Sequence, residues 1–324
     1  MIAKKYSTTL YVEALKALYK RLPRKHPKLK LIQDEYHQKV AGDLGEEVVM
    51  KVLEQVQLPY KFYVFHNISL YTESLFQMDI LIISPYYAVI FEVKNIKGEI
   101  SFTTNPLQLV RKLETGEINT YDSPVLQLEE YVYHLNQLLR GKHIHLPIYS
   151  AIVFAFTSYI KTSPSNTIVL SRKEIKSFLR KIKIDKPLLS SEDLDKLKDW
   201  ILNSNYDFLP FPICNHFSIS PESILKGVEC VQCGLIGMRK VSHNWFCPRC
   251  KIYHKKAHEQ ALRDYFFIYK NTMTNKECQQ FLKLNNKHEA TRILKNSMLM
   301  KTGQSRNAKY SILFSKVNGL TRTI

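Results

Sequence analysis

No stretch of the 324-residue sequence approaches the roughly 18 consecutive apolar residues of a membrane-spanning helix. Residues 1–30 also lack the continuous apolar segment of a signal peptide, and the sequence has no internal repeats or low-complexity tracts. We therefore expect a cytosolic protein. With 45% hydrophobic and 23% charged residues, the chain is neither disordered nor fibrous, and it can bury a core large enough for two or three domains.

Acidic residues are the scarcer of the two charge types, so the formal net charge is +18 and the pI is near 9.5. Such a charge attracts polyanions, and we expect nucleic acid rather than an anionic membrane as the partner. Residues 1–37 form a basic N-terminal segment. In it, Leu10, Ala14, Leu15 and Leu18 share one helical stripe, and we expect this helix to pack on the protein and not to anchor it in a membrane.

The rest of the sequence divides into four parts. Residues 38–207 have the helix and strand patterns of an α/β domain, and residues 208–227, interrupted by prolines, form a linker. Residues 228–254 are rich in cysteine, and residues 255–324 form a basic, mainly helical tail. Within the α/β domain the patterns predict helices over 43–57, 124–140 and 186–205 and strands near 60–70, 77–83, 87–95, 98–103 and 148–156.

Two adjacent predicted strands carry charged residues inside the apolar stretch QMDILIISPYYAVIFEVKN. If SPYY is the turn of an antiparallel hairpin, Asp79 lies opposite Glu92 on one sheet face, with Lys94 on the same face about 6.6 Å along the strand. Two neighbouring carboxylates repel each other, and burial adds to that cost, unless a divalent cation lies between them. Hard oxygen ligands suit Mg²⁺ or Mn²⁺. Lys94 would then orient or deprotonate a water, or stabilise negative charge on a phosphate under attack.

Two further polar residues are expected near this site. The helix predicted from AGDLGEE has Glu46 at the end of its apolar stripe and Glu47 on a more polar flank, so Glu46 is expected to face inward. In SPVLQLEEYVYHL, Ser123 is the expected N-cap, and Gln127 lies in the first turn on the same face as Tyr131.

The segments GDLGEE, QMDILIIS, FEVKNIKGEI and SPVLQ, in this order, resemble the NERD (nuclease-related) domain, a branch of the PD-(D/E)xK nuclease fold. The most specific piece is D-x12-E-x-K preceded by a G-E helix. The resemblance implies a restriction-endonuclease-like core, in which helices flank a central mixed sheet, and metal-dependent cleavage of phosphodiesters. The active-site positions that it implies are Glu46, Asp79, Glu92, Lys94 and Gln127. Asp79 and Glu92 would hold Mg²⁺ or Mn²⁺, with Glu46 as a further ligand or as an acid that orients water.

The sequence departs from the family pattern at positions that are not proposed ligands. Met78 stands where the family often has isoleucine, and residues 103–122 lack a tryptophan that is often found there. An E-x-K pair on a strand can also be a solvated ion pair. The alternative function is therefore a nucleic-acid-binding or regulatory protein whose nuclease fold is catalytically silent.

The cysteine-rich segment has the spacing C-x2-C-x13-C-x2-C, which is typical of a zinc ribbon. Four thiolates fill a tetrahedral shell, so the zinc is expected to be structural. The predicted ligands are Cys230, Cys233, Cys247 and Cys250. His243 and His254 lie close in sequence but are expected to be solvated, and Cys278 is expected to be a buried thiol.

The tail begins with Thr274 and Glu277 in capping-box spacing, and two short helices joined by NNK predict a helix-turn-helix. A β-hairpin around Gly303 follows in the position of a wing, and no acidic residue follows Glu289. We expect this winged-helix-like domain to bind DNA, although the same helices could form a packing domain whose charges face water. The predicted nucleic-acid-binding residues are Arg292, Lys295, Lys301, Arg306 and Lys309.

Taken together, the sequence predicts a metal-dependent nuclease that a zinc ribbon and a helix-turn-helix deliver to DNA. One site per chain would cut one strand, so cleavage of a duplex favours a homodimer.

Overall fold

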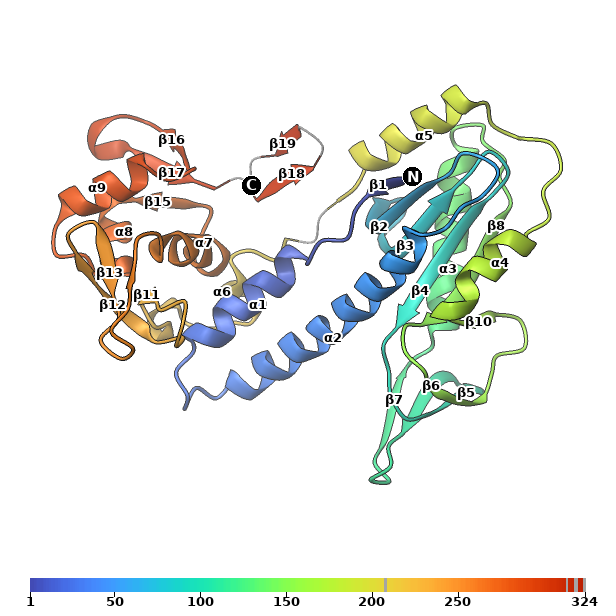
Figure 1. Ribbon diagram of the computed structural model, residues 1–324, viewed down its shortest axis with the longest axis horizontal. Helices are drawn as coiled ribbons and strands as arrows, with labels where there is room; N and C mark the ends of the chain where they lie inside the picture. The colour runs from blue at the N-terminus through green and yellow to red at the C-terminus, as the bar shows by residue number, and fades with distance from the viewer. Residues whose placement is uncertain (207–208, 313, 318–319, 323–324) are drawn as a thin grey trace. The chain divides into compact units, whose positions relative to one another are not determined.

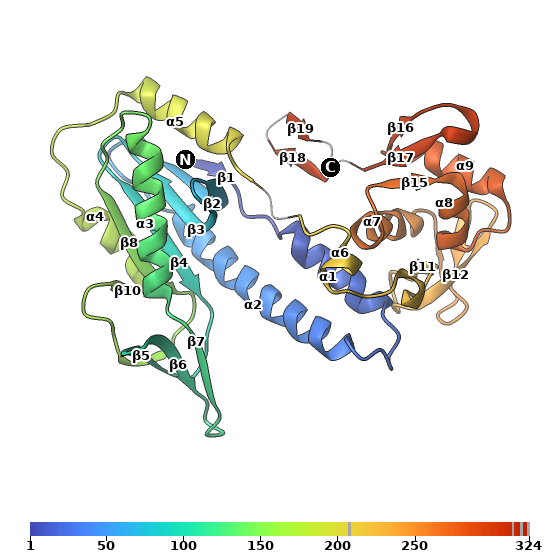
Figure 2. The same cartoon turned by 180° about the vertical axis from the view of Figure 1, so that it is seen from behind.

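The chain folds into two units, seen in the computed structural model of Figures 1 and 2, which describes residues 1–206, 209–312, 314–317 and 320–322. Unit 1 comprises residues 1–8 and 39–207, and unit 2 comprises residues 9–38 and 208–324. Helix α2 (Leu29–Leu53) contributes residues to both units. The two units are interleaved in the sequence, and the main segment of unit 1, residues 39–207, lies between the two segments of unit 2.

Unit 1 is built on a six-stranded mixed sheet with the order β1-β2-β3-β4-β8-β10. Strands β2, β3 and β4 are antiparallel neighbours, whereas β1 pairs with β2, and β8 with β4 and β10, in parallel. The strands are β1 (Ile2–Lys4), β2 (Tyr63–Tyr71), β3 (Leu75–Ile83), β4 (Ala88–Lys94), β8 (Ile148–Phe154) and β10 (Ile168–Ser171).

The hairpin between β3 and β4 has the register that the sequence predicts. The backbone N–H of Ser84 donates to the carbonyl oxygen of Tyr87 at 3.0 Å, which closes the SPYY turn. Ile80 then pairs with Phe91. The next positions along the two strands are Asp79 and Glu92, as the predicted register requires, but the backbone pairing ends before them.

Helices cover both faces of this sheet. Helices α3 (Pro124–Arg140) and α5 (Ser191–Asn203) pack on the face that carries Leu81 and Ile90, and α3 lies in front of the sheet in Figure 2. Helix α2 and helix α4 (Ile175–Lys181) pack on the opposite face, in front in Figure 1. Because both faces are covered, the central strands read as continuous apolar runs, and a charged residue in them needs a partner.

The helix boundaries follow their sequence signals with one exception. Ser123 caps α3 by accepting a hydrogen bond from the N–H of Val125, and Ser190 caps α5 in the same way. The predicted helix over 43–57 is wrong in its bounds, since α2 begins at Leu29 and ends at Leu53. No proline occurs between positions 27 and 59 to stop it, so the helix continues through polar residues that lack apolar periodicity.

The segment between β4 and α3 forms most of a second sheet with the order β7-β6-β5-β9. Its strands are β5 (Glu99–Thr104), β6 (Leu107–Lys112), β7 (Ile118–Asp122) and β9 (Tyr159–Thr162). A short 3₁₀ turn, η1 (Arg172–Glu174), leads from β10 into α4.

In unit 2, the residues predicted to be a linker are part of the core. They contain helix α6 (Ile213–His216) and the 3₁₀ turn η2 (Pro221–Ser223), and Ile213 and Cys214 are fully buried. These residues pack with helix α1 (Leu10–Arg21), whose apolar stripe is buried as predicted. The prolines interrupt periodicity without exposing the apolar residues between them.

In its described residues, the rest of unit 2 has three antiparallel sheets, and the first two share one core with three helices. The first sheet, with the order of its numbering, consists of β11 (Val228–Glu229), β12 (Ile236–Val241), β13 (Asn244–Phe246) and β14 (Tyr253–His254). The second sheet has the order β15-β17-β16, and the third consists of β18 and β19. In chain order, the elements after the first sheet are α7 (His258–Ile268), β15 (Thr272–Thr274), α8 (Asn275–Leu282), α9 (Lys287–Lys295), β16 (Met300–Thr302), η3 (Ser305–Asn307), β17 (Lys309–Ser311), β18 (Ser315–Val317) and β19 (Leu320–Arg322).

The tail follows its predictions. The capping box of Thr274 and Glu277 begins α8, and β16 and β17 form the hairpin around Gly303. Buried Trp245 of the first sheet and Phe281 of α8 belong to one apolar cluster. Across the described ranges, no helix has the length and apolar character needed to cross a membrane.

Candidate active site and metal centre

Asp79 lies where the pairing of β3 and β4 ends. The last backbone pair is Ile80 with Phe91, and the N–H of Val93 then donates to Oδ2 of Asp79 at 2.8 Å. The carboxylate of Asp79 thus accepts a hydrogen bond from the backbone of β4 in place of a backbone carbonyl, at the point where the β3–β4 pairing ends.

Glu92, Lys94 and Gln127 meet on the sheet face that α3 covers. The Nζ atom of Lys94 donates to Oε1 of Glu92 at 2.6 Å and to Oε1 of Gln127 at 3.0 Å. Glu92 is only 5% exposed, and its Oε2 atom is buried without a hydrogen-bond partner. Burying a carboxylate oxygen without a hydrogen-bond partner costs free energy. A further positive charge at this site would offset that cost.

The raised pKa of Asp79 also indicates that the site would be stabilised by a further positive charge. Burial, followed by the charges of Glu92 and Glu46, raises the pKa of Asp79 well above its usual range, and Lys94 only partly opposes this. A divalent cation between the carboxylates would reverse this shift. The donors are hard carboxylate oxygens, so the residues present fit Mg²⁺ or Mn²⁺.

Glu46 faces inward from α2, as predicted. Its side chain is 15% exposed, compared with 32% for Glu47, and its Oε2 lies 2.7 Å from Nε2 of His66. Burial and the charges of Asp43 and Glu92 raise the pKa of Glu46 to about 8. Burial and then Lys4 lower the pKa of His66 to about 4. Both groups are therefore mainly neutral at pH 7, and the contact is a hydrogen bond between neutral groups.

Gly45 explains how α2 brings Glu46 to the site. A Cβ atom added at Gly45 would lie 2.9 Å from Cβ of Asn95 and 3.4 Å from Cβ of Ala155, at the ends of β4 and β8. Nδ2 of Asn95 also donates to the carbonyl oxygen of Ala41 at 2.8 Å. The glycine in the G-E motif thus permits helix and sheet to approach closely next to the site.

Two residues near the acids were not predicted as site residues. His66 contacts Glu46, and the pKa of Tyr131 is raised first by burial and then by Glu92 and Asp79. His66 is a polar residue inside the apolar strand YVFHNISL, which is the signal that identified Asp79 and Glu92. Tyr131 follows Gln127 by one helical turn.

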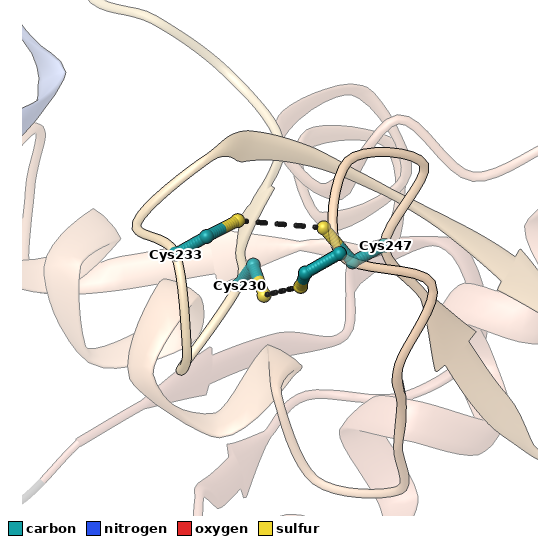
Figure 3. Close-up of side chains that lie close together, drawn as sticks. Cys230, Cys233 and Cys247 are labelled. Carbon is teal, nitrogen blue, oxygen red and sulfur yellow. Dashed lines mark hydrogen bonds between the residues drawn. The ribbon is translucent and has the colours of Figure 1, made fainter.

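The four predicted zinc ligands lie together in unit 2 and form a candidate metal centre. Sγ of Cys230 lies 3.5 Å from Sγ of Cys250, and Sγ of Cys233 lies 3.6 Å from Sγ of Cys247. Figure 3 shows the side chains of Cys230, Cys233 and Cys247 pointing toward one another. A tetrahedral zinc site with Zn–S bonds of about 2.3 Å places its sulfurs roughly 3.8 Å apart, so this arrangement can hold a zinc ion.

The backbone supports this metal centre. The N–H of Gly234 donates to the carbonyl oxygen of Cys230, and the N–H of Lys251 donates to that of Cys247, which closes the two cysteine turns. Burial raises the pKa of the Cys247 thiol, but the N–H groups of Cys250 and Arg249 outweigh it and lower this pKa to about 6. Metal ligation requires the thiolate form that this shift favours.

The acids of unit 1 are arranged more loosely than the cysteines. Within the described part of the chain, the four cysteines are the one group of three or more histidine, cysteine or acidic residues whose ligand atoms all lie within 4.8 Å of one another. Asp79, Glu92 and Glu46 are electrostatically coupled but do not form so compact a set.

The predicted nucleic-acid-binding residues of the tail lie at the surface where they are described. Arg292 and Lys295 are exposed on α9, and Lys301 and Lys309 are exposed on the β16–β17 hairpin. The side chain of Arg306 lies outside the described residues.

Comparisons with known proteins identify unit 1. Residues 41–155 match the family model of the nuclease-related domain, whereas no curated protein and no solved structure matches the chain. The match includes the hairpin with Asp79, Glu92 and Lys94 and the helix residues Glu46 and Gln127. The chain therefore contains a NERD, or nuclease-related, domain over residues 41–155.

Proposed function

We propose that this protein is a metal-dependent nuclease that hydrolyses phosphodiester bonds of nucleic acid, with DNA as the favoured substrate. The observation that carries the proposal is the meeting of Asp79, Glu92, Lys94 and Gln127 at the end of the β3–β4 pairing, with Oε2 of Glu92 buried and unpaired. The NERD match supports a nuclease-related function. The basic charge of the chain supports a polyanionic substrate.

Each residue has a proposed role. Asp79 and Glu92 hold the divalent cation, with Glu46 as a further ligand or as the acid that orients water. When bound, Mg²⁺ or Mn²⁺ supplies positive charge that activates water and stabilises a phosphate under attack. Lys94 exchanges its contact with Glu92 for the attacking water or for the phosphate charge, and Gln127 keeps its ammonium group in place.

Unit 2 is proposed to deliver the nuclease to DNA. The order α7-β15-α8-α9-β16-β17, with a three-stranded sheet, resembles a winged helix. In this arrangement α9 presents Arg292 and Lys295, and the hairpin presents Lys301 and Lys309. The zinc of the ribbon is structural, since four cysteines leave no open position.

Plasmid cleavage in Mg²⁺ and in Mn²⁺ tests the nuclease proposal. We expect the parent chain to cut the plasmid, and we expect Asp79→Ala to cut it at least about 100-fold more slowly. Glu73→Gln, which changes an exposed acid, is the matched control and should cut like the parent. A parent chain that cuts no DNA or RNA of any topology, or an Asp79→Ala variant as fast as the parent, would overturn the proposal.

A catalytically silent nucleic-acid-binding or regulatory protein is the second candidate. It is favoured by the ion pair between Lys94 and Glu92 and by the looser arrangement of the acids. This candidate predicts nucleic-acid binding without cleavage in any metal.

A homodimer is proposed for cutting both strands of a duplex, because one site per chain cuts one strand. Nicked circles at low protein concentration and linear products at high concentration would support it. Linear product as the first product at all concentrations would argue against it.

A further inference from the structure

Three side chains form a continuous row across the ribbon sheet of unit 2. Arg239 on β12 lies opposite Phe246 on β13, and Phe246 lies opposite Tyr253 on β14. Directly opposed residues share one face of a sheet. Arg239, Phe246 and Tyr253 therefore lie side by side, and we call them the aromatic row.

The aromatic row faces away from the core. The neighbouring positions, Lys240, Trp245 and His254, form the row of the opposite face, and Trp245 is fully buried in the apolar cluster of unit 2. Tyr253 is 60% exposed, Arg239 is exposed, and Phe246 is half-buried. Two aromatic rings thus lie at the surface without serving the core.

The rings are arranged with cations beside them. The ring centroids of Phe246 and Tyr253 are 5.0 Å apart, and Nζ of Lys251 lies 5.9 Å from the centroid of Phe246. Lys251 has a left-handed backbone (φ 62°) in the turn after Cys247, so the metal centre and the position of this lysine are linked. Arg239 provides a guanidinium group at the other end of the row.

The sequence segment that carries the row is basic. No acidic residue occurs between Glu229 and Glu259, whereas Arg249, Lys255 and Lys256 are exposed basic residues in this segment. A surface that combines aromatic faces with basic groups matches the chemistry of single-stranded nucleic acid, whose bases stack and whose phosphates pair with cations.

We propose that the aromatic row and Lys251 bind single-stranded nucleic acid. Bases stack on Phe246 and Tyr253, and Arg239 and Lys251 contact the phosphates. A duplex keeps its bases stacked inside, so it cannot use these rings in the same way. This inference rests on the proposed function and deepens it, because it gives the protein a second nucleic-acid contact, specific for unpaired strands.

The test measures binding by fluorescence anisotropy with labelled oligothymidylate, oligouridylate and a duplex of equal length. The full chain carries Asp79→Ala so that no probe is cut. Phe246→Leu with Tyr253→Leu removes both rings but keeps the side chains apolar, and Phe246→Tyr with Tyr253→Phe keeps both rings. Tyr159→Leu, which removes an exposed tyrosine of unit 1, is the matched control.

We expect the double leucine variant to bind single strands at least about 10-fold more weakly, because stacking on an aromatic ring contributes that much for each base. Its duplex binding should be unchanged, and the ring-preserving variant and Tyr159→Leu should bind like the parent. Zinc content equal to that of the parent shows that the ribbon is folded, as does equal Trp245 fluorescence when both chains carry Trp200→Phe.

The inference fails if the parent does not bind single strands, or if the folded double leucine variant binds them within about two-fold of the parent. The failure of this inference can be distinguished from the failure of the nuclease proposal. A chain that cuts plasmid DNA but is unaffected by loss of the rings disproves the aromatic row alone, and a chain that cuts nothing but depends on the rings disproves the nuclease alone.

Discussion

The Nζ atom of Lys94 lies 2.6 Å from Oε1 of Glu92, two residues earlier on the same strand, and 3.0 Å from Oε1 of Gln127 on α3. One lysine thus joins the charged hairpin to the helix that covers it. Because the side chain has an alternative partner in Gln127, it can release Glu92 to a cation without leaving the site.

Gln127→Ala should therefore lower the cleavage rate by about 10-fold with little change in stability, since Lys94 loses the contact that keeps it in position. The rate is measured at saturating Mg²⁺, and thermal unfolding checks the fold. Gln137→Ala, an exposed change on the same helix, is the control. Equal rates for the two variants would exclude a positioning role for Gln127.

Gly45→Ala should reduce cleavage by roughly 10- to 100-fold, because the new methyl group collides with Cβ of Asn95 and moves Glu46 relative to the strands. Gly42→Ala provides an internal comparison on the same helix. Its Cβ meets no atom within 4 Å, so it should stabilise the chain by about 0.5–1 kcal/mol and leave the rate unchanged. If both alanine variants are equally active, close approach at Gly45 is not needed for the site.

Stability should fall as the pH rises from about 6.5 to about 8, because the pKa of Glu46 is raised from 4.5 to about 8 on folding, whereas at lower pH the lowered pKa of His66 opposes this effect. In this range the folded chain binds more protons than the unfolded chain, and ionising the buried acid costs free energy. Mg²⁺ or Mn²⁺ should consequently raise the melting temperature more at pH 8.5 than at pH 5. Thermal unfolding at a series of pH values measures both effects.

Glu46→Gln should flatten this pH dependence, whereas Glu47→Gln, at the neighbouring and more exposed acid, should keep it. Equal slopes for Glu46→Gln and the parent would show that another group titrates.

Removal of zinc should unfold both the ribbon and the winged-helix-like part, because buried Trp245 and Phe281 belong to the same core. The two tryptophans of the chain lie in different units, so Trp200→Phe leaves Trp245 as a single reporter of unit 2. Chelation or Cys247→Ser should shift its emission to the red and abolish duplex binding. Retained binding by a zinc-free chain would contradict the shared core.

Point substitutions are preferable to deleting residues 255–324, which would expose this core.

Arg21→Met should destabilise unit 2 by about 3–5 kcal/mol, because it leaves Asp264 buried without its partner. Nε of Arg21 donates to Oδ2 of Asp264 at 2.8 Å, and both side chains are almost completely buried. Lys20→Met is the matched control, since its ion pair with Glu229 is more exposed and should contribute less than about 1 kcal/mol. Denaturant unfolding followed by Trp245 fluorescence measures both, and similar losses would rule out a special contribution from the buried pair.

The hairpin and the metal centre could be predicted from the sequence because their signals are local. The SPYY turn and the alternation of apolar residues fix the position of Asp79 relative to Glu92, and the cysteine spacing fixes the ligand set. His66 was missed because one polar residue in a strand does not show what it contacts. The partner, Glu46, comes from α2 on the covering layer.

Long-range packing was beyond the reach of the sequence patterns. Arg21 and Asp264 are 243 positions apart, and no periodicity relates them. For the same reason Ile213 and Cys214, between two prolines, read as a linker although they are buried against α1.

The main segment of unit 1, residues 39–207, lies between the two segments of unit 2, and this sets an order for folding during synthesis. The nuclease-related unit has all its strands and helices once residue 207 has left the ribosome. Helix α1 is synthesised earlier, but its apolar face and Arg21 lack part of their packing partners until the segment around Asp264 has been synthesised. A ribosome that stalls between these points carries a complete sequence for the nuclease-related unit but only part of the sequence of unit 2.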